Sequence, residues 1–175
     1  FPTITYHHNS GGAPEDIPAL THQQLKDFHQ KHYHPGNAIF MTYGNLSPES
    51  HQKTFESCAL SRFSWQENTL SLGDEKRFEK PLQEQGHYPL DEEEIAEKTH
   101  IVIAWLLGNS LSVKNILEAS LLNGVLLSHS ASPLRQALET TELAQAPSPL
   151  CGMEESLREM VFVCGVEGSE EQQAE

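Results

Sequence analysis

Two nearly continuous apolar runs limit the folds open to this chain. One covers residues 99–107 and the other residues 158–165, and each has the length of a strand rather than of a helix. Between them, residues 113–125 repeat apolar side chains at the spacing of one helix face. A further helix is expected after Ser132, which stands as N-cap before Pro133. Strands that alternate with helices predict an α+β fold, with layered α/β sandwich pieces in which helices pack on a mixed or antiparallel sheet.

The first apolar run is expected to form the core of the C-terminal part of the chain. A run without polar alternation is typical of a strand that is buried on both faces. We expect residues 99–107 to pack against a helix face formed by Val113, Ile116, Leu117, Ser120, Leu121, Gly124 and Val125. Replacing Ile103 with Asp should then unfold this part, because an unpaired buried carboxylate costs several kcal/mol.

The N-terminal part carries strong local signals for helices. Thr21 followed by Gln24 makes a capping box, and the helix that it opens is expected to end just before Pro35. Residues 38–43 are apolar and predict a short strand. The Ser-Pro-Glu sequence at 47–49 then marks the start of a second helix. The predicted order is loop, helix, strand, helix.

The composition changes along the chain and indicates two partial domains. Residues 58–98 mix Ser, Gln, Glu and Lys with two prolines, which is typical of a connecting region with one or two extended segments. We therefore divide the chain into a first domain part at 1–57, an inter-domain linker at 58–98, and a second domain part at 99–175. The chain starts with Phe1 rather than Met, and we expect it to be an internal piece of a longer polypeptide.

The net charge of −14, from 25 acidic and 11 basic residues, argues against a nucleic-acid partner. Binding to phosphates needs clustered Lys and Arg, whereas this acidity is concentrated in the C-terminal half. An acidic surface of this kind keeps a chain soluble and could attract a cationic peptide. The longest apolar stretch, residues 101–107, is far shorter than the roughly 20 residues that a membrane span needs. The compartment stays open, with the cytoplasm as the default expectation.

A histidine cluster is the first candidate for a metal site. Six of the ten histidines lie between His7 and His34, and His29 and His32 share one helix face at a spacing of three residues. A hydrolytic zinc helix instead places two histidines four apart, with a glutamate beside one of them to activate water. That motif occurs nowhere in the 175 residues. We therefore expect these imidazoles to pack on the helix surface.

The three cysteines, Cys58, Cys151 and Cys164, show no C-x-x-C pair. Their odd number and wide spacing argue against a disulfide framework and against a structural zinc knuckle. We expect them to be buried thiols that act as small apolar side chains.

Other candidate sites lack the context that their chemistry needs. Three serines alternate around His129: Ser128, Ser130 and Ser132. No Gly-x-Ser-x-Gly elbow accompanies them, and Ser132 is the expected helix cap. The Ser-Gly-Gly sequence at 10–12 is too short to cradle a phosphate, and the acidic run at 91–94 is typical of a solvated surface. We therefore expect no catalytic residue and no metal ligand in this chain.

Several motifs, in the same order, resemble the pitrilysin/insulinase-type zinc metallopeptidases, and most closely the presequence-protease-like branch. In the N-terminal part they are Asn9–Thr21, Phe28–His29, Tyr33–Ala38 and Tyr43–Asn45. In the C-terminal part they are Trp105–Leu107, Leu121–Gly124, Ser132–Glu139, Arg158–Phe162 and Gly165–Gly168. The resemblance covers nearly the whole chain and is weakest in the linker. Gly36, where Ser is commoner, and Ala144, where Gly is commoner, depart from the family pattern.

The resemblance implies an architecture and a place for this chain within it. Such enzymes contain four similar α/β domains in two halves around a chamber. Two histidines of a His-x-x-Glu-His helix and a later glutamate hold zinc, and unfolded peptides add as a strand to a sheet edge. Residues 1–57 would end the first, catalytic-type domain, and residues 99–175 would begin the second, non-catalytic one. The zinc ligands would lie outside this chain, so no catalytic or metal-binding residue is carried over.

The resemblance leads to one expected function and two alternatives. The chain would be a fragment of a zinc-dependent endopeptidase that degrades unfolded peptides, and it would supply chamber wall and domain packing. Its partners would be those peptides and the rest of the same polypeptide. The first alternative is a peptide-binding or scaffold homologue without zinc. The second is an acidic, histidine-rich metal-binding module.

Overall fold

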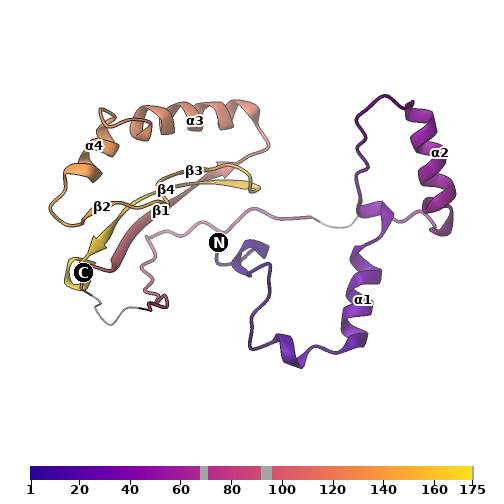
Figure 1. The fold of residues 1–175 in the computed structure, drawn as a ribbon, viewed down its shortest axis with the longest axis horizontal. Helices are drawn as coiled ribbons and strands as arrows, with labels where there is room; N and C mark the ends of the chain where they lie inside the picture. The colour runs from indigo at the N-terminus through magenta and orange to yellow at the C-terminus, as the bar shows by residue number, and fades with distance from the viewer. Residues whose placement is uncertain (68–70, 92–95, 175) are drawn as a thin grey trace. The chain divides into compact units, whose positions relative to one another are not determined.

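The computed structural model describes residues 1–67, 71–91 and 96–174, which form two compact units that divide between Gly73 and Asp74 (Figure 1). The division lies inside the segment that the sequence predicts to be a linker. The fold contains helices and an antiparallel sheet, which confirms the predicted α+β class. No helix in the described ranges is long and apolar enough to cross a membrane.

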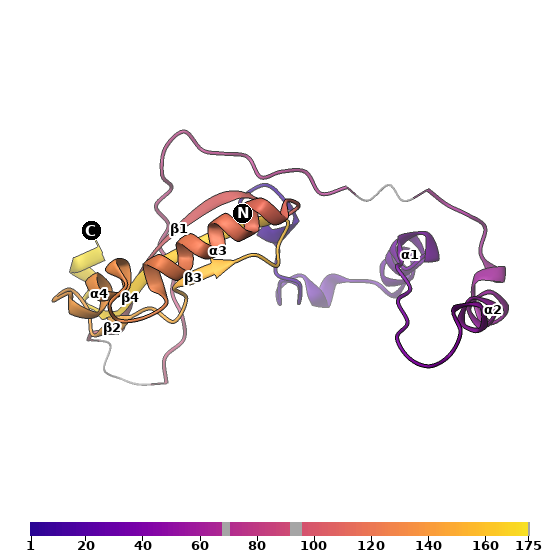
Figure 2. The same ribbon diagram turned by 90° about the horizontal axis from the view of Figure 1, so that it is seen from above.

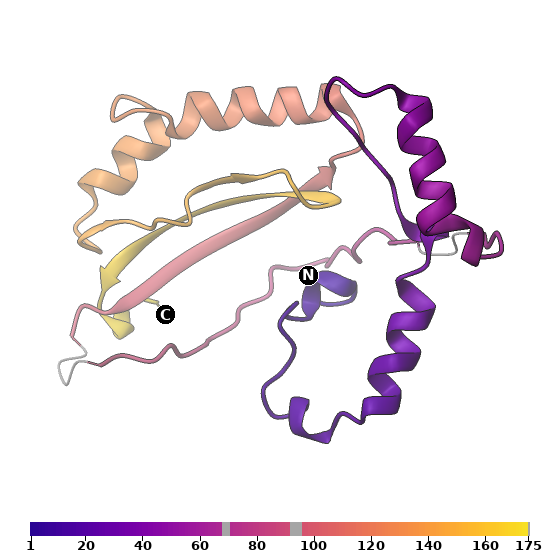
Figure 3. The same ribbon diagram turned by 45° about the vertical axis from the view of Figure 1, so that its right-hand side comes forward.

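The first unit is built from helices and turns. Its α-helices are α1 (His22–His32) and α2 (Pro48–Cys58), and its short 3-10 turns are Thr5–His7, Ile17–Ala19, Pro35–Asn37 and Leu60–Arg62. Figure 3 shows α1 and α2 with the extended chain that joins them. None of the described residues of this unit is buried.

Local capping explains where these two helices begin. The Thr21 hydroxyl accepts from the Gln24 amide at 3.2 Å, and the Gln24 side chain accepts from the Thr21 amide at 2.8 Å. This reciprocal pair is the predicted capping box. At α2, the Ser47 hydroxyl accepts from the amide of Ser50 at 3.2 Å, and Pro48 occupies the first turn. Both predicted helix starts are confirmed.

The strand predicted at 38–43 is wrong for the chain as described. These residues are extended, but they pair with no strand, and Ile39, Met41 and Tyr43 are almost fully exposed. Phe40 contacts Phe55 of α2, with ring centroids 5.1 Å apart. An apolar run becomes a strand only when another strand satisfies its backbone groups, and no described segment of this unit does so.

The second unit is a four-stranded antiparallel sheet with two helices. The strands are β1 (Thr99–Asn109), β2 (Ala146–Pro147), β3 (Gly152–Glu154) and β4 (Glu159–Ser169), and the helices are α3 (Val113–Leu127) and α4 (Pro133–Thr140). A short 3-10 turn, Glu171–Ala174, follows β4. The predicted strands and helices of this part are all present. Figures 1 and 2 show that α3 and α4 lie on the same face of the sheet.

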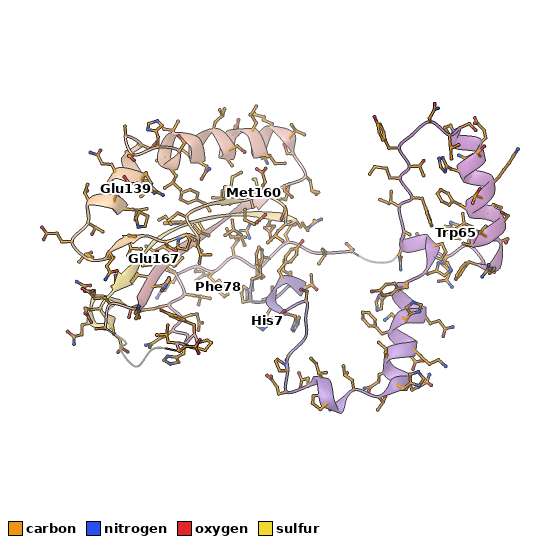
Figure 4. The ribbon with its side chains drawn as sticks, in the orientation of Figure 1. His7, Trp65, Phe78, Glu139, Met160 and Glu167 are labelled. Carbon is orange, nitrogen blue, oxygen red and sulfur yellow. The ribbon has the colours of Figure 1, made fainter. Side chains whose placement is uncertain are left out.

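The strand β4 is the centre of the sheet. Along one edge it pairs with the full length of β1, from Thr99 opposite Ser169 to Asn109 opposite Glu159. Along its other edge it pairs first with β2 and then with β3, which are separated by a turn. All the buried apolar side chains of the described residues, Met160, Cys164 and Val166, lie on β4. Figure 4 shows Met160 and Glu167 on this strand.

The expectation that residues 99–107 are buried on both faces is wrong within this unit. Val102, Ile103 and Trp105 are all exposed, and Ile103 retains 55% of its accessible surface. Val102 and Ile103 are consecutive in the strand and point to opposite faces of the sheet, so β1 is accessible on both faces at these positions. Replacing Ile103 with Asp should therefore cost much less than unfolding, because the carboxylate would still reach water.

The predicted inward face of α3 is also partly wrong. Val113, Leu117, Leu121 and Val125 lie four residues apart, and each is more than half exposed. The less exposed positions are Ile116, Ala119, Ser120, Asn123, Gly124, Leu126 and Leu127. The helix is apolar nearly all round, so its apolar spacing could not distinguish the inward face from the outward one.

Candidate functional site

The histidines of α1 are used in ring packing. His29 stacks on Tyr33 with centroids 4.8 Å apart, and His32 lies 4.5 Å from Phe28. Each pair shares one stretch of the helix surface, which confirms the predicted packing role. Among the described residues, no group of three or more His, Cys, Asp or Glu side chains could hold a metal ion. The two imidazoles therefore do not fit a zinc site.

An open hollow of about 410 Å³ follows the end of α1. The His34 ring at its wall accepts a hydrogen bond from the amide of Gly36 at 3.0 Å and meets Phe63 edge-on at 5.3 Å. The remaining walls are largely apolar, and Tyr33 and Phe40 contribute to them. The largely apolar walls suit an apolar side chain.

The serines around His129 do not form a nucleophilic site. Arg135 and Ser130 lower the pKa of the Glu139 carboxyl through hydrogen bonds, with Arg135 as the larger cause. The Ser130 side chain therefore lies close to a carboxylate on the surface of α4. Ser132 occupies the N-cap position of that helix, as predicted, but its side chain makes no capping bond. Its buried oxygen has no partner in the structure.

Two further sequence candidates give no site. The Asn9 side chain in the loop before α1 accepts from the amide of Gly11 at 2.9 Å, and Gly12 adopts a positive φ of 84°. This is a backbone turn, as the sequence predicts. Of the acidic run at 91–94, only Asp91 lies within the described residues, and it is exposed.

A buried polar cluster fixes the extended segment at 74–91, which we call the strap. The Glu159 side chain at the start of β4 is 1% exposed and accepts from the amide of Glu75 and from Arg77, each at 2.5 Å. Beside it, Arg158 binds Asp74 at 3.0 Å. A buried carboxylate is stable only when its oxygens are paired in this way. The cluster therefore fastens the strap to the sheet.

The strap is fastened at its other end as well. The Tyr88 hydroxyl donates to the carbonyl of Lys98, and its ring meets His100 of β1 edge-on at 5.4 Å. His100 in turn lies 3.9 Å from the carboxylate of Glu167. Phe78 lies on the strap between these two attachments (Figure 4). These contacts attach the strap to β1.

The cysteines differ from one another more than the sequence predicts. Cys164 is buried, Cys151 is half-buried, and Cys58 is exposed at the end of α2. The prediction of a buried thiol is therefore wrong for Cys58. Burial raises the pKa of the Cys164 thiol, and the charge of Cys151 raises it further.

The Glu159 cluster and the proximity of Cys151 to Cys164 were missed by the sequence. A single glutamate at the start of the apolar run from residue 159 was the only signal for the cluster, and nothing indicated that its partners lie 82 and 84 residues earlier. For the cysteines, the separation of 13 residues matches no known motif.

Comparison with known proteins places the chain in a family. The sequence model described as the peptidase M16 inactive domain matches residues 19–173. The chain is 33% identical to the mitochondrial presequence protease of Danio rerio over its full length, which covers 17% of that protein. It is 35% identical to the corresponding mouse protein over 96% of the chain, and 31% identical to presequence protease 1 of Arabidopsis thaliana over 98%.

The chain spans about one-sixth of the length of these curated relatives. The family match includes both α-helices of the first unit and the whole sheet of the second. It runs through Gly73 and Asp74, where the two units divide. On this match and on the shared identity, the chain belongs to the peptidase M16 family, and its residues 19–173 correspond to the region described as the inactive domain.

Proposed function

We propose that this chain is a non-catalytic part of a zinc-dependent endopeptidase that degrades unfolded peptides, and that it supplies chamber wall and domain packing. The observation that carries the proposal is the match of residues 19–173 to the inactive domain of a peptidase family. The presequence proteases that resemble the chain are named as proteases, which supports a peptidase parent. The zinc requirement is a further part of this proposal, and it rests on the family resemblance.

The chemistry of the described residues is consistent with a supporting role. Hydrolysis by a zinc peptidase needs ligands that converge on one ion and a base that activates water. In this chain His29 and His32 each contact an aromatic ring, and Ser130 lies close to a surface carboxylate. The buried carboxylate of Glu159 is taken up by the strap. The polar side chains therefore serve packing and attachment, and zinc would be held elsewhere in the polypeptide.

The test is an assay of the full-length parent on a long unstructured peptide, with and without a chelator. Activity should be lost with the chelator and restored by added zinc. In the same parent, replacing His29 and His32 together with Ala should leave both zinc content and the rate of peptide cleavage unchanged. Cleavage that continues in the presence of the chelator would refute the zinc requirement. Loss of zinc from the double variant would refute the claim that this chain supplies no zinc ligand.

Two alternatives are separated from the proposal by simple outcomes. A parent that binds the peptide but does not cleave it, with or without zinc, would be a binding or scaffold homologue. Tight stoichiometric zinc binding by the 175-residue chain, measured by calorimetry, would indicate a metal-binding module. The expected partners are unfolded peptides and the rest of the polypeptide, without nucleic acid. A cytoplasmic location remains a prediction from the sequence alone.

A further inference from the structure

Cys151 occupies the turn between β2 and β3, beside the strand β4 that carries Cys164. The turn lies between two stretches that pair with the same strand. Before it, the amide of Ser148 donates to the carbonyl of Gly165 at 2.9 Å. After it, Gly152 pairs with Val163 of β4. Cys164 is therefore the β4 residue that lies opposite the intervening turn.

The sulfur of Cys151 lies against the backbone next to Cys164. The amide of Gly165 donates to the Cys151 sulfur at 3.3 Å, and the thiol lies at the same distance from the carbonyl oxygen of Gly165. Since that amide nitrogen is two bonds from Cα of Cys164, the sulfur of Cys151 is within about 6 Å of this Cα. Because Gly152 is the Cα partner of Val163, Cys151 and Cys164 occupy the next position of the same antiparallel pairing. Residues opposite each other on antiparallel strands have Cα separations of about 4.5–5.5 Å, which lies within the range of about 4.4–6.8 Å that a disulfide spans.

We propose that Cys151 and Cys164 are a redox-active pair, which a low-molecular-weight disulfide such as glutathione disulfide converts into an intramolecular disulfide. This inference is independent of the proposed peptidase role, because it rests on the geometry of the second unit alone. It also assigns different parts to the two thiols. Cys151 is the more accessible of the two, whereas Cys164 is buried on the central strand.

The reaction balances in two exchanges. The thiolate of Cys151 attacks one sulfur of glutathione disulfide, forms a mixed disulfide and expels one glutathione thiolate. The Cys164 thiol then loses its proton and attacks the Cys151 sulfur, which expels the second glutathione thiolate. The protein loses two hydrogen atoms, and one glutathione disulfide becomes two glutathiones. The raised pKa of Cys164 lowers the fraction of its reactive thiolate and so slows the second exchange.

The bond would join the turn to the strand that it faces. Gly152, with a φ of 143°, allows the chain to change direction directly after Cys151. At present the turn is held through the Ser148 and Cys151 backbone bonds and the contacts of the Cys151 sulfur. A disulfide would fix this turn covalently and close a short loop through β3 to β4.

The experiment uses the full 175-residue chain carrying Cys58→Ser, which removes the exposed thiol and leaves the pair intact. The chain is equilibrated in glutathione buffers of increasing oxidised fraction, quenched with an alkylating agent, and mapped without reduction. We expect a linked peptide that joins Cys151 and Cys164, with a loss of both alkylation sites, and full reversal by dithiothreitol. Absence of that linked peptide across the whole series would overturn the proposal.

Two variants test the order of events. In the Cys164→Ser variant, the reaction should stop at a stable mixed disulfide on Cys151. In the Cys151→Ser variant, modification of the buried Cys164 should take at least tenfold longer than modification of Cys151 takes in the first variant. Amide exchange of β4 checks that each variant keeps its sheet. The Cys58→Ser chain with both remaining cysteines is the reference. If it accumulates the same mixed disulfide on Cys151 as the Cys164→Ser variant does, then Cys164 does not resolve the mixed disulfide and the pairing is refuted.

Discussion

The two units of this chain reach their structure by different means. In the first unit, α1 and α2 begin at side-chain caps, and none of the described residues is buried. In the second unit, most of the buried residues among those described lie on β4, the central strand of the sheet, which pairs along both edges. Local signals suffice to start a helix, whereas a core requires partners that are distant in sequence. The units should therefore respond to different substitutions.

The largest difference should come from Gly165→Ala. A Cβ at this position would collide with the carbonyl oxygen of Ile101 and lie 2.8 Å from Cα of Val102, so β1 and β4 could not keep their spacing. We expect a loss of roughly 3 kcal/mol in the free energy of unfolding of the second unit. Thermal melting with peptide-resolved amide exchange would show this loss, with exchange in α1 unchanged.

A matched control exists in the neighbouring strand. An added Cβ at Gly108 meets no atom within 4 Å, so Gly108→Ala should melt close to the unsubstituted chain. Equal destabilisation by the two substitutions would mean that the close approach of β4 to β1 does not limit stability.

A smaller effect is expected when the strap loses its charged anchor. Glu159→Gln keeps the side-chain size but weakens the bonds to Arg77 and to the amide of Glu75, which should cost about 1–3 kcal/mol. Urea unfolding followed by Trp105 fluorescence, in a chain carrying Trp65→Phe, reports the second unit. The control Glu118→Gln removes an exposed ion pair and should change stability by at most about 0.5 kcal/mol. Equal midpoints for both variants would contradict a stabilising role for the buried cluster.

In the first unit, Thr21→Ala should lower the stability of α1 by about 1 kcal/mol, because the capping box is lost. Circular dichroism should show less helix, whereas the melting of the sheet should not change. Thr21→Ser keeps the hydroxyl and should restore the helix. A drop in sheet stability in the Thr21→Ala variant would contradict the claim that the two units are stabilised by separate interactions.

The smallest effect is expected at the start of α4, in the second unit. The Ser132 oxygen is buried without a partner, so Ser132→Ala removes an unsatisfied group rather than a capping bond. We expect a change within about 0.5 kcal/mol, or a slight stabilisation, in the thermal melt. A loss as large as that of Thr21→Ala would show that the hydroxyl caps α4 in solution.

The sequence predicted the features that depend on neighbouring residues. Thr21 with Gln24, and Ser47 with Pro48, marked helix starts correctly because a cap is made within three residues. The apolar runs located β1 and β4 for a similar reason, since each is a continuous stretch of strand-forming side chains.

Features that join distant parts of the chain escaped prediction. The run at 38–43 has the composition of a strand, but its pattern cannot say whether a partner strand is present. The apolar character of α3 on most sides concealed which positions face the sheet. Glu159 and the pair of Cys151 with Cys164 become neighbours of their partners only through the register of β4, which no local pattern encodes.

The pairing of β1 with β4 also sets an order for folding. Even the nearest pair, Asn109 and Glu159, is separated in the sequence by all of α3 and α4. During synthesis, β1 leaves the ribosome before β4, and its apolar side chains stay uncovered until β4 has been synthesised. Closing such a long loop is slow compared with forming a helix. During synthesis, β1 is therefore exposed to aggregation and to chaperone binding until β4 covers it.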